Sequence, residues 1–156
     1  MKLCAQEEYG LRCLLRMVRG PAGRSMTIAE ISEAEGLSAY NVAKLMSVLR
    51  RGGLVESARG QAGGYKLARP PERITVGEVL ALLGDPFFGP QFCRDHAGNS
   101  ETCVNSSDCA LRALLGSVQS VLDYLLSRTT LKDLLISERQ MIDRLQTQTS
   151  RLLNVG

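Results

Sequence analysis

The chain has 156 residues, enough for one compact domain or a small domain with an appendage. Hydrophobic residues make up 44% of it, aromatic residues only 4%, and Trp is absent, so we expect an aliphatic core between leucine-rich helices. No segment is apolar for long enough to span a bilayer and no secretory signal is apparent, so we expect a cytoplasmic protein with no membrane partner. In that compartment disulfides rarely persist, and the five cysteines are better explained as free thiols or metal ligands.

Positive charge is concentrated in the N-terminal half of the chain. Residues 1–75 contain twelve Lys or Arg and seven Asp or Glu, a balance of +5, whereas residues 76–156 contain seven and nine, a balance of −2. Clustered Lys and Arg neutralise phosphates and release counterions from a polyanion. The charge distribution therefore favours an N-terminal region that binds double-stranded DNA.

Three helices are predicted in the first third of the chain. The first covers Ala5–Arg19, where apolar residues recur at helical spacing and basic residues form a separate stripe. Thr27 and Glu30 form a capping box that begins a second, short helix, and Ser38 caps a third helix over 39–51. Two short helices separated by a three-residue turn are typical of a helix-turn-helix.

Two short strands are predicted after the third helix, over 54–57 and 65–68, joined by a glycine-rich segment. Such a hairpin is typical of the wing of a winged helix-turn-helix, in which Arg59 stands where a guanidinium could enter a minor groove. A second capping box then begins a helix over 76–83. We therefore predict a mainly α fold, a winged helix-turn-helix with a small two-stranded wing and a long C-terminal dimerisation helix.

The candidate DNA-binding residues lie at the exposed start of the third helix, where base-edge contacts are normally made, and at the tip of the wing. Any one of them could instead contact only phosphate or water. The set consists of Ser38, Tyr40, Asn41, Lys44, Arg59, Gly60 and Gln61.

The segment over 87–107 has no periodicity and is longer than compact domains usually tolerate in a loop without a function. It contains Cys93, His96 and Cys103, and Cys109 follows it. The spacing between the cysteines differs from that of a zinc ribbon. Thiolates are soft ligands suited to iron–sulfur clusters, zinc or copper(I), and three of them with one further group complete a four-ligand site. Three unligated thiols on a surface loop are the alternative.

A long helix is predicted over 108–127, with Ser107 as its cap and Cys109 in its first turn, where the helix dipole favours a thiolate. Its apolar residues recur at threes and fours like a coiled-coil seam, which predicts packing against a second copy of the chain. A two-fold homodimer would require a near-palindromic operator. We predict a further short helix over 131–137, and beyond it a polar tail that is either helical or frayed. The two regions are thus 1–75 for DNA binding and 76–156 for sensing and dimerisation.

Several motifs together resemble a known family. They are residues 8–12 (EYGLR), 41–45 (NVAKL) and 59–65 (RGQAGGY), and the three-cysteine loop. The chain is similar from residue 1 to residue 135 to the bacterial winged-helix iron–sulfur transcription regulators that include IscR, NsrR and RirA. The resemblance implies a homodimeric transcription factor whose iron–sulfur cluster is held by Cys93, Cys103 and Cys109. Its binding to DNA would change with redox state, nitric oxide or iron supply.

The fourth ligand and the cluster type stay open. The resemblance implies an acidic ligand from the first helix of the other subunit, and Glu8 occupies that position, although Glu8 is also spaced to pair with Arg12. His96 is the alternative ligand, but it precedes the second cysteine, whereas IscR-like members place their histidine after the third. The cluster could be 2Fe-2S or 4Fe-4S. We expect Cys4 and Cys13 to be core thiols.

Two other functions compete with cluster sensing. One is a cluster-free regulator in which loop cysteines form a disulfide on oxidation. The other is a protein-binding module that regulates a metabolic enzyme and uses the wing for contact. We do not expect an enzyme, because the sequence has no plausible nucleophile–histidine pair apart from His96 with the loop thiols, and no phosphate-binding glycine loop before a helix.

Overall fold

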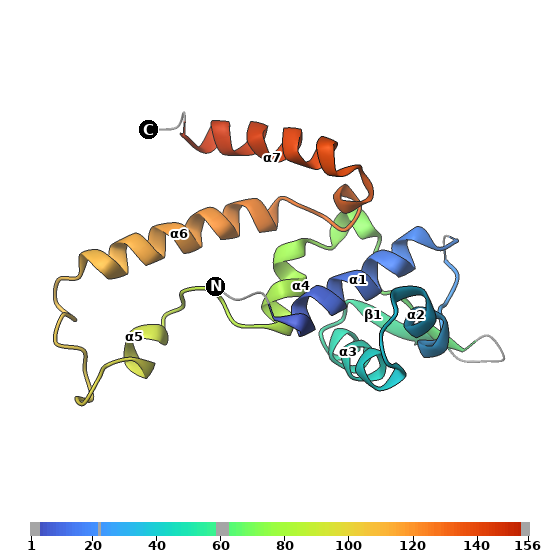
Figure 1. The fold of residues 1–156 in the computed structure, drawn as a ribbon, viewed down its shortest axis with the longest axis horizontal. Helices are drawn as coiled ribbons and strands as arrows, with labels where there is room; N and C mark the ends of the chain where they lie inside the picture. The colour runs from blue at the N-terminus through green and yellow to red at the C-terminus, as the bar shows by residue number, and fades with distance from the viewer. Residues whose placement is uncertain (1–3, 22, 59–62, 154–156) are drawn as a thin grey trace.

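The computed structural model describes residues 4–21, 23–58 and 63–153, without the side chains of residues 152 and 153. These residues form seven α-helices, two short 3-10 helices and one two-stranded antiparallel sheet, which confirms the predicted mainly α, winged fold (Figure 1). No helix in the described ranges is long and apolar enough to cross a membrane. The elements are α1 (Ala5–Arg19), α2 (Ile28–Glu35), α3 (Ala39–Arg51), β1 (Val55–Ala58), β2 (Gly64–Leu67), η1 (Pro71–Arg73), α4 (Val76–Leu83), α5 (Phe92–Asp95), α6 (Ala110–Ser127), η2 (Asp133–Leu135) and α7 (Glu138–Leu153).

The helix-turn-helix has the predicted bounds because its caps form as the sequence indicates. The Thr27 hydroxyl accepts the backbone N–H of Glu30 at 3.2 Å, and the Glu30 carboxylate accepts the backbone N–H of Thr27 at 2.7 Å. Gly36 ends α2 in the left-handed region, with φ of 66°, which glycine adopts without strain. The Ser38 hydroxyl then accepts the backbone N–H of Asn41 at 3.2 Å and begins α3. The turn between the two helices is therefore fixed at both ends.

The core of the winged helix is aliphatic, as predicted. Every helix from α1 to α4 contributes to it, together with β1 and the chain that follows α6, and each large aliphatic side chain that becomes buried stabilises the fold by about 1.5–3 kcal/mol. The largest fully buried side chains are Leu14, Ile31, Val42, Met46, Leu49, Val55, Ile74, Val79 and Leu131.

The wing is an antiparallel pair in which Val55 lies opposite Leu67 and Ala58 lies opposite Gly64. Both strands are thus displaced by one residue from the predicted ranges, the first toward the C-terminus and the second toward the N-terminus. Gly64 can lie in the second strand because it has no side chain, whereas a Cβ there would collide with the backbone of Met26. The next residue, Tyr65, exchanges two backbone hydrogen bonds of 2.8 Å with Met26. The wing is thereby attached to the loop before α2.

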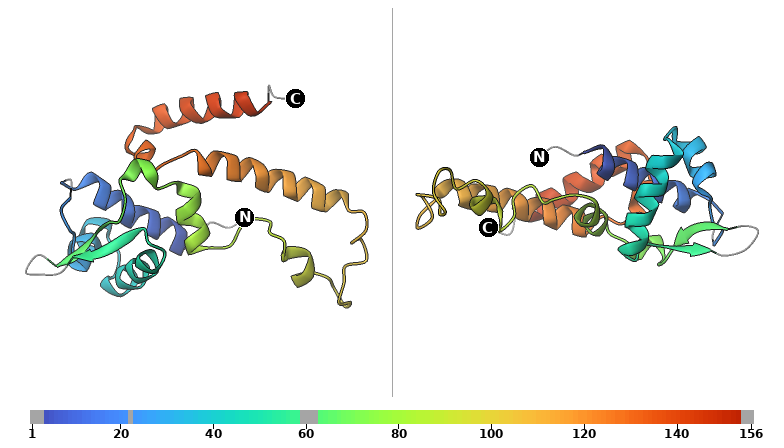
Figure 2. Two further views of the ribbon diagram at one scale, coloured as in Figure 1. Left: turned by 180° about the vertical axis from the view of Figure 1, so that it is seen from behind. Right: turned by 90° about the horizontal axis from the view of Figure 1, so that it is seen from below.

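The C-terminal half extends away from the winged helix. Helix α6 and the segment with α5 project together from the body, and α7 turns back along α6 (Figures 1 and 2). After α6 the chain returns to the core, where Val76 donates its N–H to the Thr129 carbonyl at 2.7 Å. Leu131 donates to Ile74 at 2.9 Å and is fully buried. The helix expected over 131–137 is reduced to the short η2, because the backbone of Ile136 is extended and Ser137 caps α7, with its hydroxyl accepting the N–H of Gln140 at 3.3 Å.

The region around the loop cysteines corrects two predictions. Helix α6 begins at Ala110, and its cap is Cys109, whose sulfur accepts the backbone N–H of Arg112 at 3.4 Å. Ser107 is therefore not the cap, and Cys109 precedes the first turn instead of lying within it. The preceding segment also contains α5, a single turn that is too short to produce a periodic signal. The tail forms helix α7, one of the two alternatives that its sequence allowed.

Candidate functional site

The start of α3 presents the predicted DNA-binding side chains to solvent. Ser38, Tyr40, Asn41 and Lys44 are all exposed, and Tyr40 retains 78% of its accessible surface. The helix is held by the opposite face, where its apolar side chains are buried, and its sequence contains no acidic residue. Residues 59–61, which contain the other candidates Arg59, Gly60 and Gln61, lie outside the described residues. The exposed face of α3 is therefore free to contact an anion.

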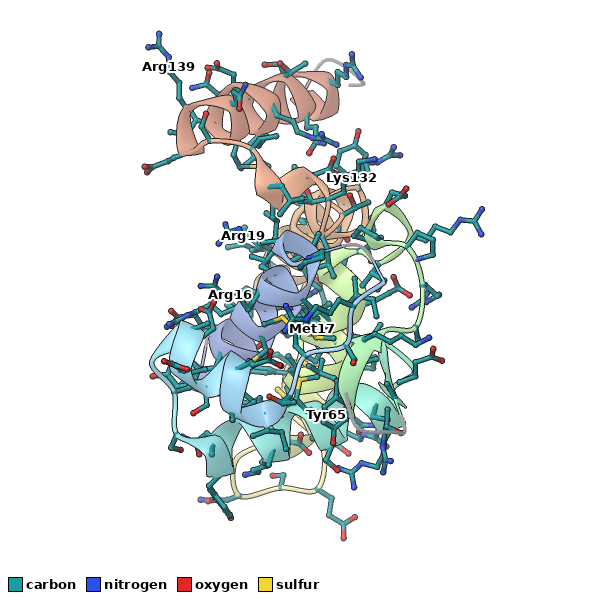
Figure 3. All side chains as sticks on the ribbon, turned by 90° about the vertical axis from the view of Figure 1, so that its right-hand side faces the viewer. Arg16, Met17, Arg19, Tyr65, Lys132 and Arg139 are labelled. Atoms are coloured by element: carbon teal, nitrogen blue, oxygen red, sulfur yellow. The ribbon has the colours of Figure 1, made fainter. Side chains whose placement is uncertain are left out.

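The basic stripe predicted on α1 serves partly to hold α2. The Nε atoms of Arg12 and Arg16 lie 3.1 Å and 2.9 Å from the two carboxylate oxygens of Glu35, whose side chain is only 11% exposed. Arg12 also donates to the carbonyl oxygen of Glu35. Figure 3 shows Arg16 on the side of α1 that faces α2. Two arginines of the stripe thus share one carboxylate within the fold and hold α2, a role that their spacing alone does not reveal.

Glu8, the candidate fourth ligand, forms the alternative ion pair. Its Oε1 lies 3.8 Å from Nη1 of Arg12, and its side chain is 57% exposed. Exposed pairs of this kind are weak because water screens them, so the pair does not hold the carboxylate strongly. The neighbouring acid, Glu7, was not predicted as a special residue, yet it is buried, and its carboxylate accepts the backbone N–H of Cys4 at 2.8 Å. Gly84 leaves room for it, because a Cβ there would collide with the carboxylate.

Cys93, Cys103 and Cys109 line one cavity of about 310 Å³, and all three are half-buried free thiols. Arg94 and Arg112 are among the other residues that line it. No group of three or more His, Cys, Asp or Glu residues within the described ranges is arranged to hold a metal ion as it stands. The three thiols are nevertheless the type of ligand that an iron–sulfur cluster takes, and their residues line the same cavity. Binding a cluster would require the loop to bring the three thiols closer together.

His96 packs against its own helical turn. Its ring stacks on Phe92 with the centroids 4.3 Å apart, and its Nδ1 lies 2.9 Å from the Phe92 carbonyl oxygen. Phe92 in turn contacts Phe88, with ring centroids 5.2 Å apart. His96 does not line the cavity that the three cysteines share. The structure therefore places this candidate ligand beside the cysteine cavity but outside it.

The two cysteines near α1 differ from each other. Cys13 is fully buried, and this burial raises the pKa of its thiol to about 11, so the group stays protonated at neutral pH. Cys4 is exposed at the N-cap of α1, which corrects the expectation that it is a core thiol. The Glu7 carboxylate accepts the backbone N–H of Cys4, so the helix start is held by a hydrogen bond and does not depend on burial of the Cys4 side chain.

The apolar residues of helix α6 form one stripe that is only partly covered. Leu122 and Leu126, in its C-terminal half, line a cavity of about 1030 Å³ that also touches α4 and the start of α1. The rest of the stripe is an uncovered apolar face, and α6 contains no fully buried residue. The exposed apolar residues are Leu111 at 62%, Leu114 at 60%, Val118 at 38% and Val121 at 44%.

Comparisons with known proteins agree with this architecture. A curated relative is the HTH-type transcriptional regulator NsrR of Shouchella clausii (strain KSM-K16). The two chains are 27% identical over 150 residues, which make up 96% of this chain and 99% of the relative. Among solved structures, T. potens IscR superposes with a TM-score of 0.68 and 26% identity over 86% of each chain. The oxidised form of Staphylococcus aureus CymR superposes with a TM-score of 0.66 and 28% identity over 86% of this chain and 95% of that one.

The sequence pattern of one family covers most of the chain. It matches residues 3–137, from the segment before α1 to the turn before α7, and so includes the winged helix, the cysteine loop and α6. The chain therefore belongs to the Rrf2 family, whose members are described as iron-dependent transcriptional regulators.

Proposed function

We propose that this regulator binds DNA as a homodimer and that an iron–sulfur cluster held by Cys93, Cys103 and Cys109 controls its affinity for DNA. The observation that carries the proposal is the shared cavity of these three thiols at the start of α6. Its similarity to the regulators NsrR and IscR supports the same reading, because 96% of the chain aligns with NsrR and 86% of it superposes on IscR. When bound, the cluster would supply a redox-active and nitric-oxide-reactive centre.

The proposed DNA contact is made by α3 and by the wing. The exposed Ser38, Tyr40, Asn41 and Lys44 would enter the major groove, where base edges carry sequence information. Arg59, Gly60 and Gln61 would contact the minor groove from the tip of the wing. The capped turn before α3 and the attachment of the wing to Met26 hold these two elements in one orientation.

The proposed dimer uses the uncovered face of α6. Leu111, Leu114, Val118 and Val121 follow one another at intervals of three, four and three residues, the spacing of a coiled-coil seam. Their exposure in a single subunit is unfavourable unless a second copy covers them. A two-fold pair of winged helices would bind a near-palindromic operator.

Helix α6 connects the proposed sensor to the DNA-binding core. Cys109 caps its N-terminal end, and the chain that follows its C-terminal end pairs with Ile74 and Val76 in the core. A change in how the loop cysteines are held can therefore shift the orientation of the two winged helices. The cluster can cause such a shift only if the loop binds it more tightly in one orientation than in the other.

The fourth ligand in this proposal is Glu8 of the partner subunit. Glu8 is exposed on α1 and is only loosely paired with Arg12, so its carboxylate is accessible. His96 remains the alternative, and it would have to leave its stacking position on Phe92 to approach the cysteine cavity. Replacing Glu8 with Gln and His96 with Ala separates the two, since only the true ligand changes the absorption spectrum of the cluster.

A second candidate function is a thiol switch without a cluster. The three free thiols share one cavity, and CymR, to which the chain is similar, has been solved in an oxidised form. In this case two of the cysteines would form a disulfide on oxidation and thereby alter the loop.

The two functions are separated by purifying the wild-type protein and Cys103→Ala without oxygen. Cluster control predicts coloured wild-type protein that contains iron and acid-labile sulfide, and colourless Cys103→Ala whose DNA affinity no longer responds to nitric oxide. Cys4→Ala is the matched control, because Cys4 is exposed but lies outside the cysteine cavity. Colourless wild-type protein whose DNA affinity follows reversible disulfide formation would instead establish the thiol switch.

A further inference from the structure

The exposed face of α3 extends beyond the candidate DNA-binding residues. Tyr40, Lys44, Ser47 and Arg51 follow one another at intervals of four, three and four residues, and at about 100° per residue they form one narrow stripe. Tyr40, Lys44 and Arg51 are exposed, and Ser47 is half-buried. The stripe therefore runs the whole length of the helix and ends in a cation.

The charge of Arg51 has no acidic partner among the residues that the structure describes. Within the described ranges, Lys44 and Arg51 form no ion pair, and Arg19, Arg50 and Arg73 form none either, whereas five other cations of the winged helix have an acidic partner. An exposed guanidinium without an acidic neighbour retains its five donors for an external anion. The paired cations are Arg12 and Arg16 with Glu35, Arg24 with Glu30, Lys66 with Glu56 and Arg69 with Glu78.

The backbone that carries Arg51 is firmly held. A Cβ at Gly52 would collide with the Leu82 side chain, so this glycine lets the end of α3 pack closely against α4. Gly52 donates its N–H to the Val48 carbonyl at 3.0 Å, and Gly53 takes a left-handed conformation with φ of 71°. The side chain of Arg51 thus projects from a fixed position at the junction of α3 and the wing.

The length of α3 would place Arg51 at the edge of the major groove of a bound DNA duplex. Tyr40 and Arg51 are eleven residues apart, which corresponds to about 16 Å along a helix. The major groove of B-DNA is about 12 Å wide, so when the start of α3 touches base edges its far end lies over the groove wall, where the phosphates are. Arginine binds phosphate with two parallel hydrogen bonds.

We propose that Arg51 is a DNA phosphate-binding residue that anchors the far end of α3, while Tyr40 and its neighbours contact the bases. The inference rests on the proposed function and deepens it, because it assigns a residue outside the predicted set and fixes which end of α3 meets the backbone of the duplex.

Arg50 offers a matched control. Both arginines lie in the last turn of α3, where a cation interacts favourably with the helix dipole, so this general effect is common to both. One turn before Arg50 stands the fully buried Met46, whereas one turn before Arg51 stands Ser47 on the exposed stripe. Arg50 is therefore exposed on the flank of the helix, away from the stripe.

The experiment compares Arg51→Gln, Arg51→Lys and Arg50→Gln in the full-length protein. Two duplexes serve as probes, one selected by the wild-type protein from a randomised pool and one with the same bases in scrambled order. Binding is measured over a range of salt concentrations. For Arg51→Gln we expect the slope of log affinity against log salt to fall by about 1.8 on both duplexes, about 0.9 for each of the two Arg51 side chains of the dimer, with the affinity ratio between the duplexes unchanged. Arg51→Lys and Arg50→Gln should keep the wild-type slope.

Two results would overturn the assignment. An unchanged slope for Arg51→Gln, or an equal loss for Arg50→Gln, would show that Arg51 makes no specific phosphate contact. A changed ratio between the two duplexes would make Arg51 a base contact, as we expect for Tyr40→Ala. If the wild-type protein selects no duplex and binds neither probe in a salt-dependent manner, the proposed function itself fails.

Discussion

Leu131 donates its backbone N–H to the carbonyl oxygen of Ile74 at 2.9 Å, and both side chains are fully buried in the core of the winged helix. The two residues stand on either side of the cysteine loop and α6 in the sequence. This contact makes the sensor region a long excursion that leaves the DNA-binding core after α4 and returns to it. The far end of α6 therefore cannot move without disturbing the core.

The first prediction concerns this anchor. Leu131→Ala removes a fully buried side chain and leaves a cavity, so we expect the free energy of unfolding to fall by about 2–5 kcal/mol. Leu135→Ala is the control, because Leu135 is 41% exposed and its loss should cost much less. Denaturant unfolding monitored by circular dichroism measures both. Equal losses for the two variants would mean that Leu131 is not an anchor.

A second prediction concerns thiol reactivity. Cys13 is fully buried and its thiol pKa is raised to about 11, so it should resist iodoacetamide in the native protein at neutral pH. The exposed Cys4 and the half-buried loop cysteines should be alkylated first in cluster-free protein. Mass spectrometry of peptides after timed labelling gives the order. Early labelling of Cys13 would contradict the packing of α1 described above.

Much of the fold follows from the sequence because local signals decide it. The boxes at Thr27 and Thr75 each place a hydroxyl three residues before a glutamate, and in both cases the helix begins there. The remaining errors have identifiable physical causes. The helix expected over 131–137 is shortened because Ile136 is extended and Ser137 forms a capping box with Gln140 that begins α7 instead.

The candidate site was less predictable. The cysteine loop is conspicuous in the sequence, but the local pattern favours Ser107 as the cap of α6 where the structure has Cys109, since a thiol is an unusual helix cap. The neutralisation of Arg12 and Arg16 depends on Glu35 of a different helix, and the burial of Glu7 depends on Gly84 of α4. These roles depend on how the helices pack against one another, so the periodicity of the sequence does not reveal them.

A third prediction concerns the dependence of stability on pH. Partial burial raises the pKa of the Asp133 carboxyl, but hydrogen bonds from Thr130 and the charge of Arg144 outweigh this, and the pKa lies below its ordinary value. Because the folded state lowers this pKa, the stabilisation is fully present above about pH 3.9 and is lost as the pH falls through the folded value. Asp133→Asn should therefore cost about 1–2 kcal/mol at neutral pH and progressively less in acid.

The measurement for Asp133 is denaturant unfolding of both proteins from neutral to acid pH. Asp143→Asn, which changes an exposed acid on α7, should leave the free energy of unfolding unchanged throughout. A loss for Asp133→Asn that stays constant in acid would exclude the charge of Asp133 as its cause.

A fourth prediction concerns the dimer. Leu114→Glu places a charge in the proposed seam of α6, so we expect a monomer with unchanged helix content and weakened DNA binding. Ile142→Glu is the matched control, because Ile142 is also an exposed apolar residue, at 47%, but lies on α7. Sedimentation velocity gives the oligomeric state. If Leu114→Glu remains dimeric, the uncovered face of α6 is not the interface.

We propose that the three loop cysteines hold an iron–sulfur cluster that governs DNA binding. Native mass spectrometry of the protein isolated without oxygen tests it most directly, because it reports the oligomer and the mass of any bound cofactor together. We predict a dimer that carries iron and sulfide in the ratio of a 2Fe-2S or a 4Fe-4S cluster, and that loses this mass in Cys93→Ala, Cys103→Ala and Cys109→Ala. A wild-type dimer with the bare mass of two polypeptides would contradict the claim.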